Sequence, residues 1–246
     1  RGDGGQLAVG MRAAGDRVVL WCPDPHNPAG EGILPRVGNA SWRDYAARAD
    51  VVIADGNFGS SRTRRSWRPS RWVEELQAVR RSGVPYYGPV PTSELLENDA
   101  RYARKTLARL GLPTGSVQEP AVDVELGVDG RGGTTLSIPV EGGTWVYPVS
   151  PMARLPLSLT PLVEFLRRIH YAGPLNVALC VGAEHMSIEH LWTSFRYPAV
   201  YGQAHLARTQ GAIPVMVRNG SEIVEGVAAP DSVAHVVNLL TAWSWI

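Results

Sequence analysis

The first 90 residues combine two kinds of hydrophobic pattern. Continuous apolar runs, which are typical of strands buried in a parallel sheet, lie at 17–24, 50–57 and 84–89. Between these runs, residues 41–49 and 71–83 carry apolar side chains at helical spacing, with Ser41 as the predicted N-cap of the first helix. Because strands and helices alternate, the pattern predicts right-handed βαβ units in a Rossmann-like sheet.

The pattern changes in the second half of the chain. Residues 92–115 predict one long helix, 117–149 several strands broken by glycine-rich turns, and 158–173 another helix. Within 172–203, two short apolar runs flank the residues GAEH and predict a hairpin. The second run contains Glu189, and a charge inside an apolar strand needs a partner or a function.

Composition limits the possible partners only weakly. The chain has 246 residues, of which 44% are hydrophobic, so it can bury the core of one or two domains. The net charge of +1 gives no overall argument for a nucleic-acid or membrane partner. No apolar stretch is long enough to span a membrane. The sequence gives no indication of the oligomeric state.

Two residue types narrow the chemistry further. Cys22 and Cys180 both lie in apolar runs, as buried reduced thiols usually do, so we expect a cytoplasmic protein. Of the 24 basic residues only Lys105 is a lysine, so these residues cannot support a mechanism that needs two lysines.

Four stretches stand out in order along the chain: GDGGQLAVGMRAAGDRV, VPYYGPVPTSELLENDARYARKTLARLGLPTG, RRIHYAGPLNVAL and IEHLWTSFRYP. Together they resemble the ATP-grasp ligases, and among them phosphoribosylamine–glycine ligase. The first looks like the glycine loop and helix of that family's N-terminal domain, and the second like its strand, "GP" turn and following helix. The third is similar to the passage into the catalytic core, and the fourth to the family's acidic signature.

The resemblance implies an α/β fold of several parts. These are a Rossmann-like N-terminal domain at 1–90, a linking helix at 91–115, an ATP-grasp α+β core at 116–204 and a small C-terminal domain at 205–246. The lid subdomain that the family places after Gly115 is missing from this core, and no strand precedes Gly2. Either the lid has been lost, or these residues are the ordered parts of a longer chain; the missing first strand favours the second interpretation.

The resemblance also implies a reaction and its cofactors. ATP phosphorylates a carboxylate, and an amine then attacks the acyl phosphate to give an amide and ADP. Glu189 matches the glutamate that binds Mg²⁺ at the ATP phosphates, and Arg196 matches a signature arginine that contacts phosphate or substrate. Lys105 is predicted to bind ATP, because the family helix carries a lysine near position 100, where this chain has Ala100. The family's asparagine after the glutamate is Leu191 here.

Zinc and nicotinamide sites are disfavoured by spacing. His185, Glu189 and His190 do not share one face of a strand, so they do not form a zinc site. The opening loop lacks the third spaced glycine of a dinucleotide site. In the resembled family Gly4 and Gly5 of this loop face the ligase substrate.

A second candidate substrate-binding loop follows the run at 50–57. Loops at the carboxyl edge of a parallel sheet are well placed for ligands, and this one is rich in arginine and tryptophan, which bind phosphate and stack on bases. A solvated loop whose tryptophans pack on the domain is the alternative. The candidate residues are Asn57, Gly59, Arg62, Arg64 and Arg65.

Three functions stay open. The leading hypothesis is an ADP-forming carboxylate–amine ligase of purine-biosynthesis type that acts on small molecules with ATP and Mg²⁺. The second is a catalytically degenerate ATP-grasp fold used as a binding or structural component, which Leu191 and Ala100 favour. The third is a nucleic-acid-binding or nucleic-acid-modifying protein that uses residues 62–72.

Overall fold

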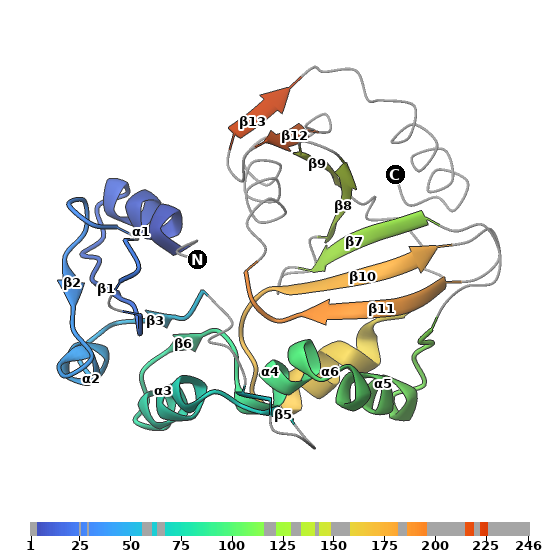
Figure 1. The fold of residues 1–246 in the computed structure, drawn as a ribbon, viewed down its shortest axis with the longest axis horizontal. Helices are drawn as coiled ribbons and strands as arrows, with labels where there is room; N and C mark the ends of the chain where they lie inside the picture. Colours follow the sequence, from blue (N-terminus) through green and yellow to red (C-terminus); the bar gives the residue numbers. More distant parts are fainter. Residues whose placement is uncertain are drawn as a thin grey trace.

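The structure of this chain is a computed structural model. It describes residues 4–24, 26–28, 30–55, 61–62, 67–115, 122–128, 134–140, 143–148, 158–181, 186–195, 215–218 and 222–225. Helices and strands are mixed throughout, and a part with short strands precedes a larger sheet (Figure 1). None of the helices in the described ranges is long and apolar enough to cross a membrane.

The N-terminal part contains two pairs of parallel strands. β1 (Leu20–Trp21) pairs with β2 (Arg36–Val37), and β3 (Val52–Ile53) pairs with β6 (Tyr86–Tyr87). The helix α3 (Arg71–Arg81) connects the second pair, as the alternating pattern predicts. The other elements are α1 (Gly4–Ala13), α2 (Trp42–Ala46), β4 (Ser61–Arg62) and β5 (Trp67–Arg68), the last two paired antiparallel.

An aromatic cluster fills the core of this part. Trp21 stacks on Trp42 with ring centroids 4.4 Å apart, and the edge of Trp72 lies 5.1 Å from Trp21. Trp42 is buried, together with Leu76 and Tyr86. Trp72 therefore packs on the domain. This agrees with the alternative interpretation of residues 62–72, in which the tryptophans pack on the domain and do not bind a ligand.

One predicted helix start is confirmed, and one predicted helix is divided. Ser41 is the N-cap of α2, as predicted, but its side chain makes no capping hydrogen bond, and its Oγ donates instead to the carbonyl oxygen of Gly38 over 3.5 Å. The single helix predicted at 92–115 is two helices, α4 (Pro91–Asn98) and α5 (Ala100–Arg109). Asp99 separates them because its extended backbone ends α4, while its carboxylate accepts the backbone N–H groups of Arg101 and Tyr102 and starts α5.

A seven-stranded sheet in the order β11-β10-β7-β8-β9-β12-β13 dominates the rest of the chain, and every pair of neighbours is antiparallel. The predicted hairpin is confirmed as β10 and β11. β12 and β13 come from the predicted C-terminal segment and continue the same sheet, because β12 pairs with β9 and β13 pairs with β12. The strands are β7 (Val122–Val128), β8 (Thr134–Val140), β9 (Gly143–Pro148), β10 (Leu175–Val181), β11 (Met186–Trp192), β12 (Val215–Arg218) and β13 (Glu222–Glu225).

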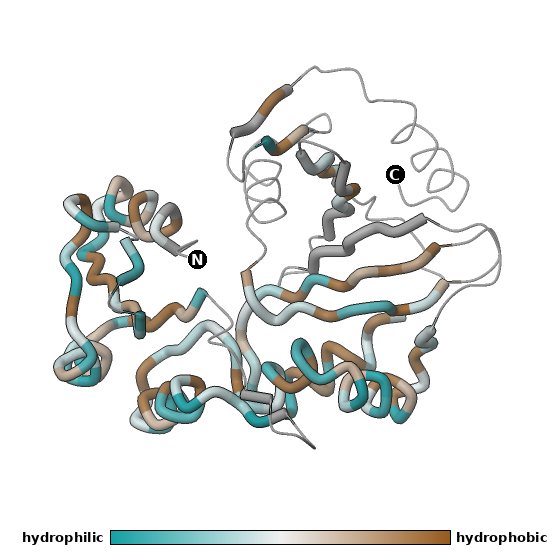
Figure 2. Tube along the Cα trace, viewed as in Figure 1, coloured by the Kyte–Doolittle hydropathy of each residue, from teal (hydrophilic) through white to brown (hydrophobic). Residues whose placement is uncertain are grey.

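Three helices cover the β10–β11 end of this sheet. α4, α5 and α6 (Thr160–Arg168) lie together below β10 and β11, at the far end of the molecule from β13 (Figure 1). Their apolar sides are seen in brown in Figure 2, and they share one core cluster with alternate residues of β10. Val177 and Leu179 of β10 pack there with Leu107 of α5 and Leu162 of α6. This packing fixes α5 beside the strand that carries Glu189.

Candidate functional site

Glu189 lies in a β-bulge of the sheet's edge strand. Ala178 of β10 pairs with His190, and the next β10 residue, Leu179, pairs with Ile188, so Glu189 has no register partner on β10. The extra residue lets both Ile188 and Leu191 point into the core, where they are 2% and 1% exposed. Glu189 itself is exposed. The concern that this carboxylate is a buried charge was therefore wrong, because the bulge turns it out of the core.

Residues 113–115 cover the outer edge of β11 as far as the bulge. The backbone N–H of Ile188 donates to the carbonyl of Pro113 over 2.9 Å, and Thr114 forms a parallel bridge with Ile188. The hydroxyl of Ser187 donates to the carbonyl of Gly115. The segment that follows α5 thus pairs with the strand up to Ile188, and Glu189 is the next residue along.

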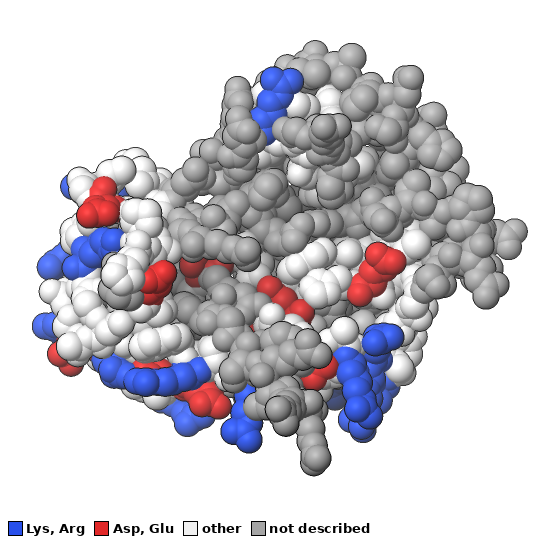
Figure 3. Space-filling view, viewed as in Figure 1, with Lys and Arg blue, Asp and Glu red and all other residues white. Residues whose placement is uncertain are grey.

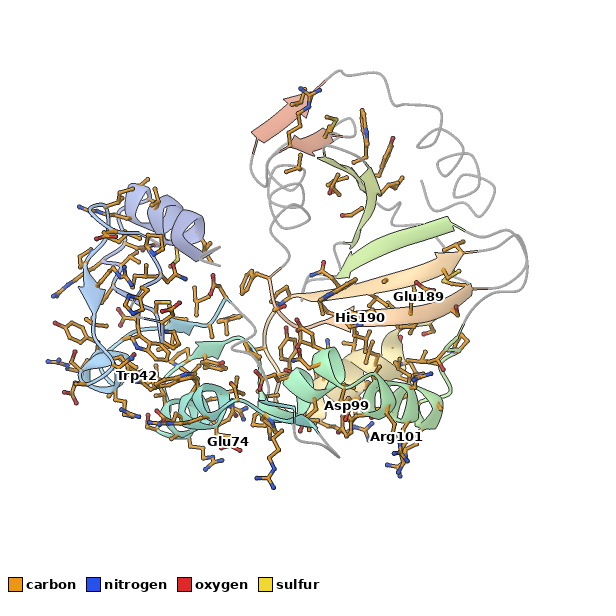
Figure 4. The ribbon with its side chains drawn as sticks, in the orientation of Figure 1. Trp42, Glu74, Asp99, Arg101, Glu189 and His190 are labelled. Atoms are coloured by element: carbon orange, nitrogen blue, oxygen red, sulfur yellow. The ribbon has the colours of Figure 1, made fainter. Side chains whose placement is uncertain are left out.

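A cavity of about 240 Å³ lies between this bulge and α5. From the strand side, Glu189 and His190 reach it, and Figure 4 shows both on the sheet beside α5. From the helix side, Arg104 reaches it, with its Nε 3.2 Å from the carbonyl of Ala100. The remaining lining residues are small or apolar: Ala100, Ala103, Leu107, Gly115, Ile188 and Leu191.

The charged groups of this cavity are not paired with each other. Both ion pairs of the described chain involve Glu75 of α3, so within the described residues neither Glu189 nor Arg104 forms one. Figure 3 shows basic side chains gathered over α5 and an acidic side chain on the neighbouring sheet. As far as the described residues show, the cavity therefore presents to a ligand a carboxylate and a guanidinium that form no ion pair.

Lys105 points to a different cavity. That cavity, of about 290 Å³, is lined from α5 by Lys105, Tyr102 and Arg109 and from α6 by Phe165. Consecutive helix residues lie about 100° apart around the axis, so Arg104 and Lys105 face different neighbours. The structure does not bring Lys105 and Glu189, the two predicted ATP-binding residues, together.

The other predicted site residues are placed only in part. Gly4 and Gly5 begin α1, and the backbone of Arg62 belongs to β4. Asn57, Gly59, Arg64, Arg65 and Arg196 lie outside the described residues, and so does His185. Their described neighbours do meet: the N–H of Phe195, which precedes Arg196, lies 3.4 Å from the carbonyl oxygen of Asp55 at the end of β3.

A buried polar junction holds the end of β11 against α4. One carboxylate oxygen of Glu97 accepts the N–H of Thr193 (2.9 Å) and lies 3.3 Å from the Thr193 hydroxyl, and the other accepts the hydroxyl of Ser194 (2.6 Å). The Tyr171 hydroxyl donates to the carbonyl of Thr193 over 2.8 Å. Sequence reasoning missed Glu97. The sequence feature that could have indicated it is the spacing of three residues from Glu94, which places both carboxylates on the same buried side of a short helix.

Glu94 ties the junction to the N-terminal part. Its carboxylate accepts the backbone N–H of Ser70 at 2.6 Å, and Ser70 in turn caps α3 by accepting the N–H of Val73. Burial raises the pKa of Glu94 above its ordinary value, although the hydrogen bonds from Ser70 act in the opposite direction. Burial also raises the pKa of Tyr86 and Tyr171, both of which stay neutral donors. The junction thus connects α3, α4 and the end of β11.

The donor set suits a hard cation that brings its own ligands. In the described ranges no three His, Cys, Asp or Glu residues come together in a way that could hold a metal ion alone. Mg²⁺ bound with a nucleotide takes most of its ligands from phosphate oxygens and water, and one or two protein carboxylates suffice. The exposed carboxylate of Glu189 beside a cationic side chain fits that requirement.

No protein-family model matches the chain, and no curated protein matches it. Solved structures do. Glycinamide-RNase-transformylase T from Mycobacterium tuberculosis superposes with a TM-score of 0.55 at 14% identity, over 81% of this chain and 71% of that one. N5-carboxyaminoimidazole ribonucleotide synthetase from Thermus thermophilus gives 0.54 at 15% identity, over 80% and 70%.

A further N5-carboxyaminoimidazole ribonucleotide synthetase, solved as an ADP complex, gives a TM-score of 0.53 at 13% identity over 81% of this chain and 70% of that one. The chain spans 22% of a single-chain, multi-domain long-chain acyl-CoA carboxylase, with a TM-score of 0.47 that is too low to support an argument. At such identities a likeness shows the fold alone. The described chain shares its mixed helix-and-strand fold with these enzymes.

Proposed function

We propose that this protein is an ATP-dependent, ADP-forming ligase that joins a carboxylate to an amine, in the manner of phosphoribosylamine–glycine ligase. The observation that carries the proposal is the exposed carboxylate of Glu189, set by a bulge into a cavity that also contains the guanidinium of Arg104. The fold shared with the two N5-carboxyaminoimidazole ribonucleotide synthetases supports it. In the reaction, the γ-phosphoryl group passes to the substrate carboxylate, the amine attacks the acyl carbon, and phosphate leaves.

Each predicted site residue other than Lys105 has a role in this scheme. Glu189 binds Mg²⁺, which when bound neutralises charge on the ATP phosphates. Arg196 contacts phosphate or substrate through its guanidinium, which suits bidentate binding. The first N–H groups of α1, at Gly4 and Gly5, bind the anionic substrate. Asn57, Gly59, Arg62, Arg64 and Arg65 bind the acceptor.

Calorimetric titration with Mg·ATP tests the proposal. We expect the wild-type protein to bind, and Glu189→Gln to weaken binding about tenfold or more, as loss of a metal-bound carboxylate should. The matched control is Glu74→Gln, an exposed carboxylate on α3 far from the cavity (Figure 4). Absence of Mg·ATP binding by the wild-type protein, or equal binding by Glu189→Gln, would refute the proposed site.

The degenerate fold is the second candidate, because Leu191 packs in the core and Ala100 supplies no cation to the cavity. A protein that binds Mg·ATP but releases no ADP with any carboxylate and amine pair would support it. The nucleic-acid alternative stays a prediction. Oligonucleotide affinity that falls steeply with salt is the measurement that would support it.

A further inference from the structure

We propose that Arg104, and not Lys105, is the α5 side chain that binds the polyphosphate of the nucleotide. This inference rests on the proposed function of the Glu189 cavity, and it names the side chain that binds the phosphates there. It departs from the sequence-based expectation, in which Lys105 takes this role.

Helix geometry assigns Arg104 to the cavity. Ala100, Ala103, Arg104 and Leu107 all line it, and their spacing of three and four residues places them on one side of α5. Lys105 lies outside this set and lines the cavity that faces Phe165 of α6. Of the basic residues on α5, Arg104 is therefore the one that shares a cavity with Glu189.

The charge arrangement indicates the class of ligand. A carboxylate and a guanidinium in one small cavity ordinarily attract each other, yet within the described residues Glu189 and Arg104 form no ion pair. Such a separated pair is complementary to a ligand that carries both charges. A divalent cation bound to a polyphosphate is such a ligand: the metal meets the carboxylate, and the phosphate oxygens meet the guanidinium.

The surrounding residues provide the space. Ala100 and Ala103 line the cavity from the helix, and Gly115 lines it from the segment that pairs with β11, so these three positions add little side-chain bulk to the space that Arg104 and Glu189 share. The Nε of Arg104 is held by the carbonyl of Ala100 one turn earlier. Among the described residues the guanidinium has no other hydrogen bond, so its two terminal NH₂ groups can bind an anion.

Equilibrium titrations of the intact chain with Mg·ATP, Mg·ADP and adenosine test the inference. Because a charge-assisted contact is lost, we expect Arg104→Ala to weaken Mg·ATP binding about 10- to 100-fold. Adenosine binding should not change. The matched control, Lys105→Ala, removes the adjacent cation of the same helix and should change Mg·ATP affinity less than about twofold.

A rescue variant separates a phosphate contact from a general loss of helix stability. Ala100 lies one turn before Arg104 on the same side of α5 and lines the same cavity. Ala100→Lys in the Arg104→Ala background returns a cation to the cavity and should recover a large part of the Mg·ATP affinity, but should leave adenosine binding unchanged.

The possible outcomes are distinct. Wild-type binding of Mg·ATP with equal binding by Arg104→Ala overturns the inference and leaves the proposed function standing. A large loss in Lys105→Ala instead assigns the phosphate to Lys105 and also overturns it. No Mg·ATP binding by the wild-type protein refutes the proposed function, and the inference with it.

Discussion

Removal of the Glu97 carboxylate should destabilise the protein through the end of β11. Glu97 is only 8% exposed, and its two oxygens accept hydrogen bonds from the backbone N–H of Thr193 and the hydroxyl of Ser194. Both of these residues are buried, so water cannot replace the carboxylate without opening the junction. The Thr193 hydroxyl has a second contact, with the carbonyl of Ser93 at 3.2 Å, and does not lose its only partner.

The size of the effect follows from these donors. Each buried donor left without an acceptor costs about 1–3 kcal/mol, and Glu97→Ala leaves two, so we expect a loss of about 2–6 kcal/mol in the free energy of unfolding. Glu97→Gln is much milder, at about 1 kcal/mol. Its carbonyl oxygen still accepts from Thr193, and its amide donates to the Ser194 hydroxyl, which can rotate to accept.

Urea unfolding of the two variants gives the free energies directly. The control is Glu74→Ala, an exposed carboxylate on α3 that should cost less than about 0.5 kcal/mol. Amide hydrogen exchange at Thr193 gives a local measurement, because this N–H should lose protection in Glu97→Ala and keep it in Glu97→Gln. If Glu97→Ala unfolds like the control, or if exchange at Thr193 does not change, the Glu97 carboxylate does not hold the end of β11.

Three further substitutions test other parts of the fold. The raised pKa of Glu94 means that the folded state keeps this proton to higher pH than the unfolded state. The free energy of unfolding therefore falls as pH rises above about 4.5. Glu94→Gln should reduce this pH dependence, measured by urea unfolding between about pH 4 and pH 7. A Cβ on Gly88 would lie 2.7 Å from the Cβ and the carbonyl oxygen of Ala54, so Gly88→Ala should lower thermal stability clearly more than Gly83→Ala, which has positive φ but open space. Leu191→Asn introduces the asparagine of the resembled acidic signature, yet it buries an amide in the core, so we expect a loss of about 3 kcal/mol or more in the free energy of unfolding and no tighter binding of Mg·ATP in calorimetry.

The periodic elements were predictable because their signal is local. The runs at β10 and β11 gave a hairpin, and the alternation before residue 90 gave parallel strands, since both depend only on the spacing of apolar residues. The break at Asp99 also had a local signal, an aspartate able to cap a second helix, but the helical spacing on both sides hid it. The pairing of β12 onto β9 had no such signal, because it joins segments far apart in the sequence.

The site depended on packing that the sequence shows only indirectly. Ile188 and Leu191 are three residues apart, which breaks the two-residue period of a strand and is the trace of the bulge. The distinction between Arg104 and Lys105 required knowing which side of α5 meets β11. A helical pattern alone shows that two such residues point in different directions, but it does not show which neighbour each one meets.

An exposed charge in a bulge also has a purely structural explanation, since both features protect the edge of a sheet from pairing with other chains. The pairing of residues 113–115 stops at Ile188, so Glu189 lies where that protection is needed. Edge protection requires only a charge, and lysine serves as well as glutamate. Glu189→Lys should therefore stay monodisperse in light scattering under either explanation, but a cation at this position repels Mg²⁺. Loss of Mg·ATP binding in a soluble Glu189→Lys protein would identify a ligand site, whereas unchanged binding would leave edge protection as the reason for the bulge.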